Sequence, residues 1–314
     1  MGEIEAYLRA LGVKARKFEA RKSIRVNTLK IGVKELTRRL DGIGLELEKI
    51  PWSEQGFYIG WNTGSDGGPQ GLKLGNILEH ALGYYFIQDA ISMLIPRVLL
   101  DGMGKGGWNG VKVLDLAAAP GAKNTQLSQI MSNEGVVVAN DASSGRIKAL
   151  AMNVQRMGCV NTIVTHTDGR NFPNWGNDMF DAVLVDAPCS GWGQASAAGT
   201  RGALGKYAPL QKDLILAGFD CLKPGGSMVY STCTFSVEEN EKVVQHLLDN
   251  RVSARVADAQ LDGISDGSVK YEKGLKKFEG KAFDESMHKC ARIYPWLNDS
   301  DGFFVCKLTK DENA

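Results

Sequence analysis

The sequence predicts an α/β protein with a large domain built on a mostly parallel sheet flanked by helices, and a small α/β domain before it. After residue 110, short β-branched and apolar runs alternate with stretches of helical period. Strands that alternate with helices are joined by right-handed crossovers and therefore lie parallel. Helices cover both faces of such a sheet, which explains why the strand runs are continuously apolar. A length of 314 residues also favours two domains.

Residues 1–75 are predicted to form the small domain. We expect a helix near residues 3–11, a strand in SIRVNTL, a helix over 33–40, and strands near 45–50 and 56–60. The following stretch, WNTGSDGGPQG, is rich in glycine, which is typical of a turn-rich connection. The large domain is therefore expected to span residues 76–314.

The large domain begins with an apolar stretch over residues 76–100, which is expected to be helical in two pieces around residues 83–88. Strands are then predicted in VKVLDLAAA, GVVVAN, NTIVTHTD, FDAVLVDA and SMVYSTC. The helix after GVVVAN has an apolar face from Ile147 to Met157, and Gly158 is expected to end it. Another helix is predicted to begin at Ser236, because Glu239 three residues later would complete a capping box.

The composition is that of an ordinary soluble protein, with 43% apolar and 23% charged residues. No stretch approaches the roughly 20 apolar residues of a membrane span, and the N-terminal stretch has no apolar core with a cleavage site. The six cysteines include no CxxC pair, so free thiols are favoured over a metal site. We expect a cytoplasmic, monomeric protein that binds no metal and no membrane.

Positive charge is concentrated near the N-terminus, although the whole chain has a formal net charge of only +1. The first 40 residues contain 11 Lys and Arg against four Glu. A basic segment of this kind can bind nucleic-acid phosphates by releasing counterions. The alternative is a solvated helical face.

Ligand-binding residues are expected beyond the carboxyl ends of the strands, where open α/β sheets bind their ligands. The first strand run ends in a turn of small residues that leads into a helix beginning near Lys123; the turn consists of Ala117, Ala118, Ala119, Pro120, Gly121 and Ala122. Small side chains let a ligand approach the main chain, and the amides of a helix start favour a carboxylate or phosphate.

Acidic residues end the next three strand runs: Asp141, Asp168 and Asp186. A carboxylate at such a position can bind both hydroxyls of a ribose, although each Asp alone is also common in a turn. The turn lacks the GxGxxG pattern of a dinucleotide site. Together these residues predict a nucleoside-containing cofactor without a pyrophosphate, and S-adenosylmethionine fits.

Two cysteines also follow strand runs: Cys189 in VDAPCSGWG and Cys233 in SMVYSTCTF. Both have proline, serine, threonine or glycine neighbours, which sets them apart from the other four cysteines. Those four lie in helical or strand periods and are predicted to be buried small apolar residues: Cys159, Cys221, Cys290 and Cys306.

Several segments together resemble the Sun/Fmu-type RNA (cytosine-5)-methyltransferases, and the likeness runs from about Ser23 to Leu308; the segments are SIRVNTLK, DLAAAPGAKNTQL, DAPCSGWG, LQKDLILAGFDCLKPGGSMVYSTCTFSVEENE and RIYPWLNDSDGFFVCKL. The resemblance implies a Rossmann-like, S-adenosylmethionine-dependent methyltransferase domain and a small RNA-binding domain. It also implies that Cys233 is the nucleophile and that Cys189 helps to release the product. Cofactor contacts are implied for the turn from Ala117 to Lys123 and for Asp141, Arg146, Asp168 and Asp186.

The chemistry of such a reaction requires groups of these kinds. Carbon 5 of cytosine is a poor nucleophile, so a thiolate must first add to carbon 6. The proton on carbon 5 must later leave, and a second thiol can assist that step. Asp186 is a candidate to hydrogen-bond the base, and Lys123 to lower the thiol pKa or to orient the base. Because DNA cytosine methyltransferases attack with a Pro-Cys motif, the assignment of Cys233 as nucleophile depends on the resemblance.

The sequence differs from the family pattern at three places. The family commonly has Cys-Ala-Ala-Pro-Gly-Gly-Lys-Thr where this chain has AAAPGAKN, and we expect cofactor binding to survive the change. The segment 192–211 is short of the basic residues often found there, and Trp296 stands where histidine is usual.

The target nucleotide must be flipped out or lie in a loop, so recognition is expected to rely on shape and phosphates. The candidates for phosphate contacts are Arg21, Lys22, Arg25 and Lys30, and Asn27 is expected to be structural. The compact chain resembles members that modify tRNA, with ribosomal RNA as the alternative. Two further alternatives are a nicotinamide-dependent oxidoreductase, which leaves both thiols unexplained, and a non-catalytic RNA-binding or ribosome-assembly protein.

Overall fold

The computed structural model describes residues 2–14, 16, 19–61, 73–194 and 203–312. The glycine-rich connection predicted after residue 61 lies almost wholly outside this part of the chain, as does much of the segment 192–211. No helix in these ranges is both long and apolar enough to cross a membrane.

The small domain contains an antiparallel sheet with the strand order β2-β3-β1-β4. Its elements are α1 (Gly2–Ala10), β1 (Ser23–Val26), α2 (Val33–Asp41), β2 (Leu45–Lys49), β3 (Gly56–Trp61), the 3₁₀ turn η2 (Leu74–Asn76), α3 (Leu78–Ala81) and β4 (Tyr85–Ile87). Leu36 and Leu40 of α2 are fully buried in the same core as Ile24 and Val26 of β1. Strand β4 is not predicted by the sequence, and it completes the small sheet beyond the boundary expected at residue 75.

The large sheet has a parallel part in the order β9-β8-β5-β6-β7. These strands are β5 (Lys112–Asp115), β6 (Val136–Asn140), β7 (Thr162–Thr165), β8 (Phe180–Asp186) and β9 (Leu222–Thr232). The first four lie within the predicted runs, whereas β9 begins at Leu222, before the run SMVYSTC that starts at Ser227. The sheet continues past β9 with antiparallel strands that the sequence does not predict: β15 (Phe303–Lys310), β14 (Ala291–Ile293), β11 (Glu272–Lys273) and β10 (Ala254–Ala257). A small ribbon of β12 (Lys277–Phe278) and β13 (Lys281–Ala282) stands apart.

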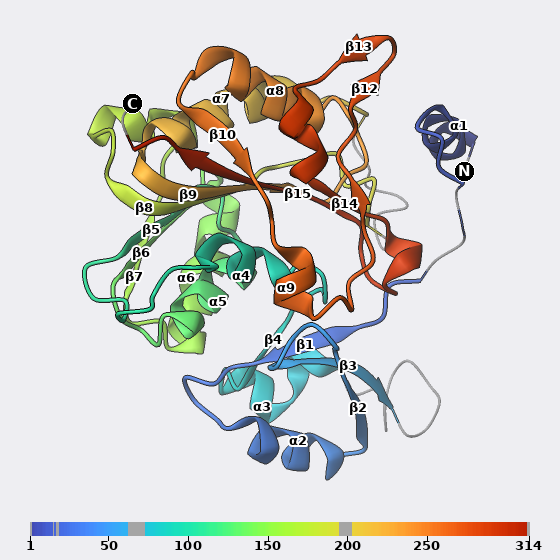
Figure 1. Ribbon diagram of the computed structural model, residues 1–314. Coiled ribbons are helices and arrows are strands. Elements are labelled where there is room, and N and C mark those ends of the chain that lie inside the picture. The colour runs from blue at the N-terminus through green and yellow to red at the C-terminus, as the bar shows by residue number, and fades with distance from the viewer. Residues whose placement is uncertain (1, 15, 17–18, 62–72, 195–202, 313–314) are drawn as a thin grey trace.

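Helices cover both faces of this sheet (Figure 1), as the continuously apolar strands predict. On one face lie α7 (Ala208–Asp220) and α8 (Glu241–Asn250), and on the other α4 (Leu94–Leu100), α5 (Ala122–Ile130), α6 (Ser144–Met157) and α9 (Leu261–Ser265). Short 3₁₀ turns complete the chain: η3 (Gly169–Trp175), η4 (Glu285–Lys289) and η5 (Pro295–Leu297). Gly158 ends α6 in the left-handed conformation, as predicted.

The capping box predicted at Ser236 is wrong in part. The Ser236 hydroxyl does accept the N–H of Glu239, at 3.3 Å, but α8 begins only at Glu241. The Glu239 carboxylate does not reach back to Ser236, because it accepts the N–H of Ser190 at 2.9 Å instead.

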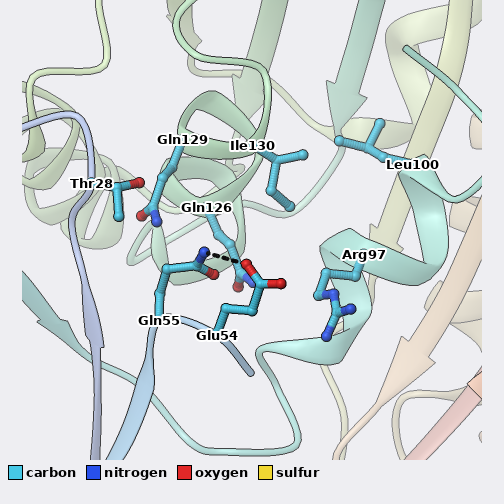
Figure 2. A pocket seen from close by; sticks show the side chains of 8 residues that line it. All are labelled: Thr28, Glu54, Gln55, Arg97, Leu100, Gln126, Gln129 and Ile130. Atoms are coloured by element: carbon cyan, nitrogen blue, oxygen red, sulfur yellow. Dashed lines mark hydrogen bonds between the residues drawn. The ribbon is translucent and has the colours of Figure 1, made fainter. Parts of the chain in front are cut away.

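A pocket of about 390 Å³ lies where the small domain meets α4 and α5 (Figure 2). Its walls carry both polar and apolar side chains, namely Thr28, Glu54, Gln55, Arg97, Leu100, Gln126, Gln129 and Ile130. None of the predicted catalytic or cofactor-binding residues is among them. The cysteine-bearing edge of the large sheet is therefore a separate site.

Candidate active site

The structure brings Cys189 and Cys233 together at the carboxyl edge of the sheet. Strands β8 and β9 are parallel neighbours, with Asp186 paired to Ser231, so the segments that follow them leave the sheet at the same place. The two sulfur atoms are 2.9 Å apart. The N–H of Cys233 also points to the sulfur of Cys189, at 3.3 Å. A single substrate atom can therefore be reached by both thiols.

The environment of Cys233 favours the thiol over the thiolate. Its hydrogen bond with Cys189 and its burial raise the pKa of Cys233 well above the ordinary value. The Lys123 ammonium lowers this pKa, in the direction predicted, but its effect is smaller. For Cys233 to act as the predicted nucleophile, its thiol must consequently lose a proton first.

Lys123 and Asp186 form an ion pair beside the thiols. The Lys123 ammonium lies 2.7 Å from one carboxylate oxygen of Asp186, and the Ser231 hydroxyl donates to the other at 2.7 Å. Burial lowers the pKa of Lys123, but the charge and hydrogen bond of Asp186, together with the smaller effects of Cys233 and Asp115, raise it overall. A charged donor and a charged acceptor are thus held at the end of β8, where a base could be bound by its polar edge.

The turn from Ala117 to Ala122 is held by Asp141 and Arg146, which follow the next strand, β6. Asp141, which directly follows β6, accepts the N–H of Ala119 at 3.2 Å and that of Ser143 at 2.9 Å. Arg146 donates to the carbonyl of Ala119. Gly121 has φ of +108°, a conformation that favours glycine, and α5 starts directly after it.

Asp168 is already engaged with its own neighbour. It accepts the N–H of Arg170 as the N-cap of η3, and the Arg170 guanidinium lies 2.6 Å from its carboxylate. This pairing lowers the pKa of Asp168. A cofactor contact by Asp168 therefore stays a prediction.

Asp115, the last residue of β5, is a site residue that the sequence reasoning missed. It is 1% exposed, and neither of its carboxylate oxygens has a hydrogen-bond partner of normal geometry among the described residues. Burial, and then the nearby Asp186 charge, raise the pKa of Asp115 to about 8. The signal was an acidic residue inside the apolar run VKVLDL.

An unpartnered buried carboxylate next to a turn of small residues fits the amino-acid end of S-adenosylmethionine, which carries an ammonium group. The amides at the start of α5 fit its carboxylate, and Asp141 fits the ribose hydroxyls. The residues present are therefore compatible with the predicted cofactor.

The basic residues predicted to contact RNA have different environments. Arg21 and Lys22 are exposed, and Arg21 pairs with Glu48 at 2.5 Å. The Lys30 ammonium donates to the carbonyls of Leu82 and Arg156, at 3.0 and 2.7 Å.

Arg25 is 1% exposed, and its guanidinium donates to the carbonyl of Ala122 and the hydroxyl of Thr125, both at 2.9 Å. Arg25 is thus unavailable to a phosphate, and we correct its role to a contact between the domains. Asn27 is structural, as expected, because its amide donates to the carbonyls of Gly83 and Met157.

Helix α1 lies against both cysteine segments. The Tyr7 hydroxyl accepts the N–H of Val237 at 2.7 Å and donates to Glu238 at 2.8 Å. Leu8 packs in one cluster with Trp192 and Phe235. Trp296 belongs to the same cluster and stacks on Tyr294, with 5.2 Å between the ring centroids. The four remaining cysteines are buried, as predicted.

Comparison with known proteins identifies the family. The family model described as 16S rRNA methyltransferase RsmB/F matches residues 108–309, more than half of the chain. The chain belongs to this RsmB/F family. A second model, the N-terminal domain of 16S rRNA methyltransferase RsmF, matches residues 3–90. The Sun/Fmu-type resemblance is thereby confirmed.

Curated relatives of this RsmB/F chain are described as ribosomal RNA small subunit methyltransferase F. The protein from Vibrio atlanticus is 40% identical over 296 residues, which cover 92% of this chain and 58% of the relative. The protein from Aliivibrio salmonicida is 41% identical over 307 residues, covering 95% of this chain and 60% of the relative. The chain thus spans about three fifths of the length of these relatives.

Solved structures confirm the fold of the RsmB/F chain. A methyltransferase homolog from Pyrococcus horikoshii has 32% sequence identity and a TM-score of 0.74, covering 96% of this chain and 88% of that one. NSun6 from the same organism has 24% identity and a TM-score of 0.77, covering 98% and 94%. The Rossmann-like methyltransferase fold is confirmed. The cofactor of this family is S-adenosylmethionine, which confirms the predicted cofactor.

Proposed function

We propose that the chain methylates carbon 5 of a cytosine in small-subunit ribosomal RNA through a covalent cysteine–cytosine intermediate. The observation that carries this proposal is the pair of thiols, 2.9 Å apart, beside the Lys123–Asp186 pair. Ribosomal RNA is favoured over the tRNA expected from the compact chain because the relatives carry names of ribosomal RNA methyltransferases. Such a substrate also agrees with the expected cytoplasmic location.

The proposed reaction assigns one step to each thiol. The Cys233 thiolate adds to carbon 6 of the flipped base, and the electron pair of the carbon 5–carbon 6 double bond makes carbon 5 nucleophilic. Lys123 and Asp186 bind the polar edge of the ring and stabilise the charge that develops there. When bound, S-adenosylmethionine supplies the methyl group. Asp115, Asp141 and the turn at Ala117–Ala122 would hold it.

Release needs a base near carbon 5. Cys189, as a thiolate, takes the carbon 5 proton, the double bond re-forms, and the bond between carbon 6 and sulfur breaks. The electron pair of that bond returns to Cys233 as a thiolate. The 2.9 Å separation of the sulfurs supports this division of labour, because carbons 5 and 6 are bonded neighbours.

The small domain is proposed to bind RNA, with Arg21 and Lys22 as its exposed candidates for phosphate contacts. We place the end of this domain after β4, because that strand pairs with β1.

The test compares single cysteine variants. We expect Cys233→Ala to abolish methylation and to form no adduct, because no thiol attacks carbon 6. Cys189→Ala should leave enzyme and RNA joined, visible as a slowly migrating band on a denaturing gel. Cys159→Ala, which alters a buried cysteine outside both segments, is the control and should behave like the wild type.

The opposite pattern, with the adduct in Cys233→Ala only, would reverse the assignment of the two thiols. Cofactor binding without methylation of any RNA by the wild-type protein would instead support the non-catalytic alternative.

A further inference from the structure

The two peptide groups that flank Cys189 are both held by buried side chains. The Gln211 amide donates to the carbonyl of Pro188 at 2.7 Å, and the Glu239 carboxylate accepts the N–H of Ser190 at 2.9 Å. Gln211 and Glu239 are also hydrogen-bonded to each other, at 3.2 Å. Both side chains are fully buried. This pair, from α7 and from the segment before α8, therefore fixes the main chain on both sides of the sulfur.

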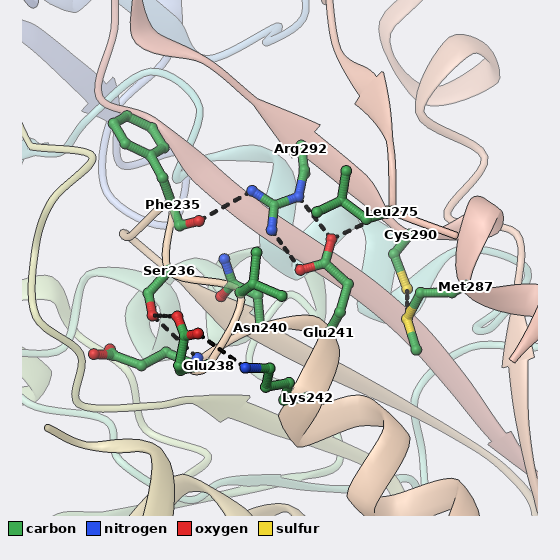
Figure 3. A network of polar contacts seen from close by, with 12 residues as sticks. Phe235, Ser236, Glu238, Asn240, Glu241, Lys242, Leu275, Met287, Cys290 and Arg292 are labelled. Atoms are coloured by element: carbon green, nitrogen blue, oxygen red, sulfur yellow. Dashed lines mark hydrogen bonds and ion pairs between the residues drawn. The ribbon is translucent and has the colours of Figure 1, made fainter. Parts of the chain in front are cut away.

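Cys233 is held by a different side chain. The Asn240 amide donates to the carbonyl of Thr234 at 2.9 Å, and its oxygen accepts the hydroxyl of Thr232 at 2.6 Å. The next residue, Glu241, binds Arg292, whose guanidinium donates to the carbonyl of Phe235 at 3.1 Å (Figure 3). Different side chains thus support the two cysteine segments, although Glu239 and Asn240 are neighbours in the chain and the N–H of Gly193 donates to the carbonyl of Cys233 at 2.9 Å.

Both carboxylate oxygens of Glu239 act as hydrogen-bond acceptors. One oxygen binds Ser190 and Gln211, and the other accepts the N–H of Gly205 at 3.0 Å. A glutamine has only one acceptor oxygen, so its amide group would place a donor against a main-chain N–H. Replacing the carboxylate by an amide therefore sets a donor against the N–H of either Ser190 or Gly205, and this repulsion displaces the side chain that holds the Cys189 segment while its volume stays nearly the same.

We propose that Gln211 and Glu239 are positioning residues for Cys189 and so control product release, whereas Asn240 positions Cys233 and controls attack. This proposal rests on the proposed function, because it assigns the separate supports to separate steps of that reaction. A displaced Cys189 removes the carbon 5 proton slowly, so the bond between carbon 6 and Cys233 persists. A displaced Cys233 slows the formation of that bond.

Two RNA substrates separate the steps. Fluorine in place of the carbon 5 hydrogen cannot leave as a proton does, so RNA containing 5-fluorocytosine traps the methylated adduct and reports attack and methyl transfer but not release. Ordinary RNA reports release, because its adduct accumulates only when the carbon 5 proton is removed slowly. Both adducts are measured on denaturing gels with S-adenosylmethionine present.

For Glu239→Gln and Gln211→Met we expect the rate of trapping on 5-fluorocytosine RNA to stay within about threefold of the wild-type rate. Turnover on ordinary RNA should be slower by about tenfold or more, and the covalent adduct should accumulate on that RNA. For Asn240→Asp we expect about tenfold slower trapping and no accumulation. Glu238→Gln, an adjacent carboxylate with no contact to Pro188 or Ser190, is the matched control and should match the wild type.

Equal slowing of both steps in Glu239→Gln and Gln211→Met would overturn the proposal, because the pair would then hold the site as a whole. If Glu239→Gln does not fold, Gln211→Met decides the same question. Failure of the wild type itself to trap on 5-fluorocytosine RNA would overturn the proposed function, and the role of the pair with it. Trapping by the wild type with no difference among the variants would overturn only the proposed role of Gln211 and Glu239.

Discussion

At the scale of single residues, the reactivity of Cys233 depends on its neighbours more than on its own position. Cys189 and burial raise the pKa of its thiol, and the nearest cation, Lys123, is already paired with Asp186. While Cys233 is protonated, its sulfur is protected from oxidation, because oxidants react with the thiolate. The proposed attack of Cys233 on carbon 6 consequently requires that its thiol first lose a proton.

A pH dependence follows from this environment. The pKa of Cys233 lies well above that of a free thiol, so the thiolate is a small fraction at neutral pH and grows about tenfold per pH unit below the pKa. We expect the trapping rate on 5-fluorocytosine RNA to rise from pH 7 to 9 with a slope near one on logarithmic axes. A plateau below pH 8 would contradict the raised pKa.

At the scale of elements, α5 connects the turn from Ala117 to Ala122 that we propose for the cofactor, Lys123 that we propose for the base, and the small domain. It starts after Gly121, carries Lys123 in its first turn, and is held from outside by Arg25 of β1. Because Arg25 bonds to the carbonyl of Ala122 and to Thr125, the small domain contributes directly to the placement of this first turn.

Replacing Arg25 with methionine should therefore destabilise the protein and weaken cofactor binding. Two hydrogen bonds are lost, to the Ala122 carbonyl and to the Thr125 hydroxyl, so we expect the free energy of unfolding to fall by about 1–3 kcal/mol. Urea denaturation measures the first effect, and calorimetric titration with S-adenosylmethionine the second. Arg21→Met, which breaks an exposed ion pair, is the matched control and should change stability by less than about 1 kcal/mol. Unchanged cofactor affinity in Arg25→Met would show that α5 needs no support from the small domain.

The elements that the sequence predicts are those whose signals are local. The parallel strands and α6 have clear periods and ends, and Gly158 ends α6 where expected. Strand β15 has an equally apolar sequence, but its place beside β9 depends on contacts distant in the chain. Arg25 and Glu239 were misjudged for the same reason, since their partners, Ala122 and Ser190, lie far away in sequence. Charge patterns and capping boxes relate only residues that are close in the sequence, so they cannot reveal such partners.

At the scale of the whole molecule, the site is assembled from segments spread over most of the chain. The sequence could place Asp186, Cys189 and Cys233 at strand ends, because parallel strands end at one edge. It could not show that α1 packs on both cysteine segments through Leu8 and Tyr7. The candidate active site is consequently built by both domains.

The RNA substrate can be identified in cells that lack this protein. Bisulfite treatment converts cytosine but leaves 5-methylcytosine, so sequencing of treated small-subunit ribosomal RNA and of tRNA reveals which methyl groups disappear. We expect the loss of a small-subunit ribosomal RNA site, with every tRNA site retained, because the relatives that match this chain are ribosomal RNA small subunit methyltransferases. Re-expression of the wild-type chain should restore the site, and re-expression of Cys233→Ala should not, because that change removes the thiol proposed to attack carbon 6. A lost tRNA site with intact ribosomal RNA would instead assign the chain to tRNA and leave the cysteine chemistry untouched.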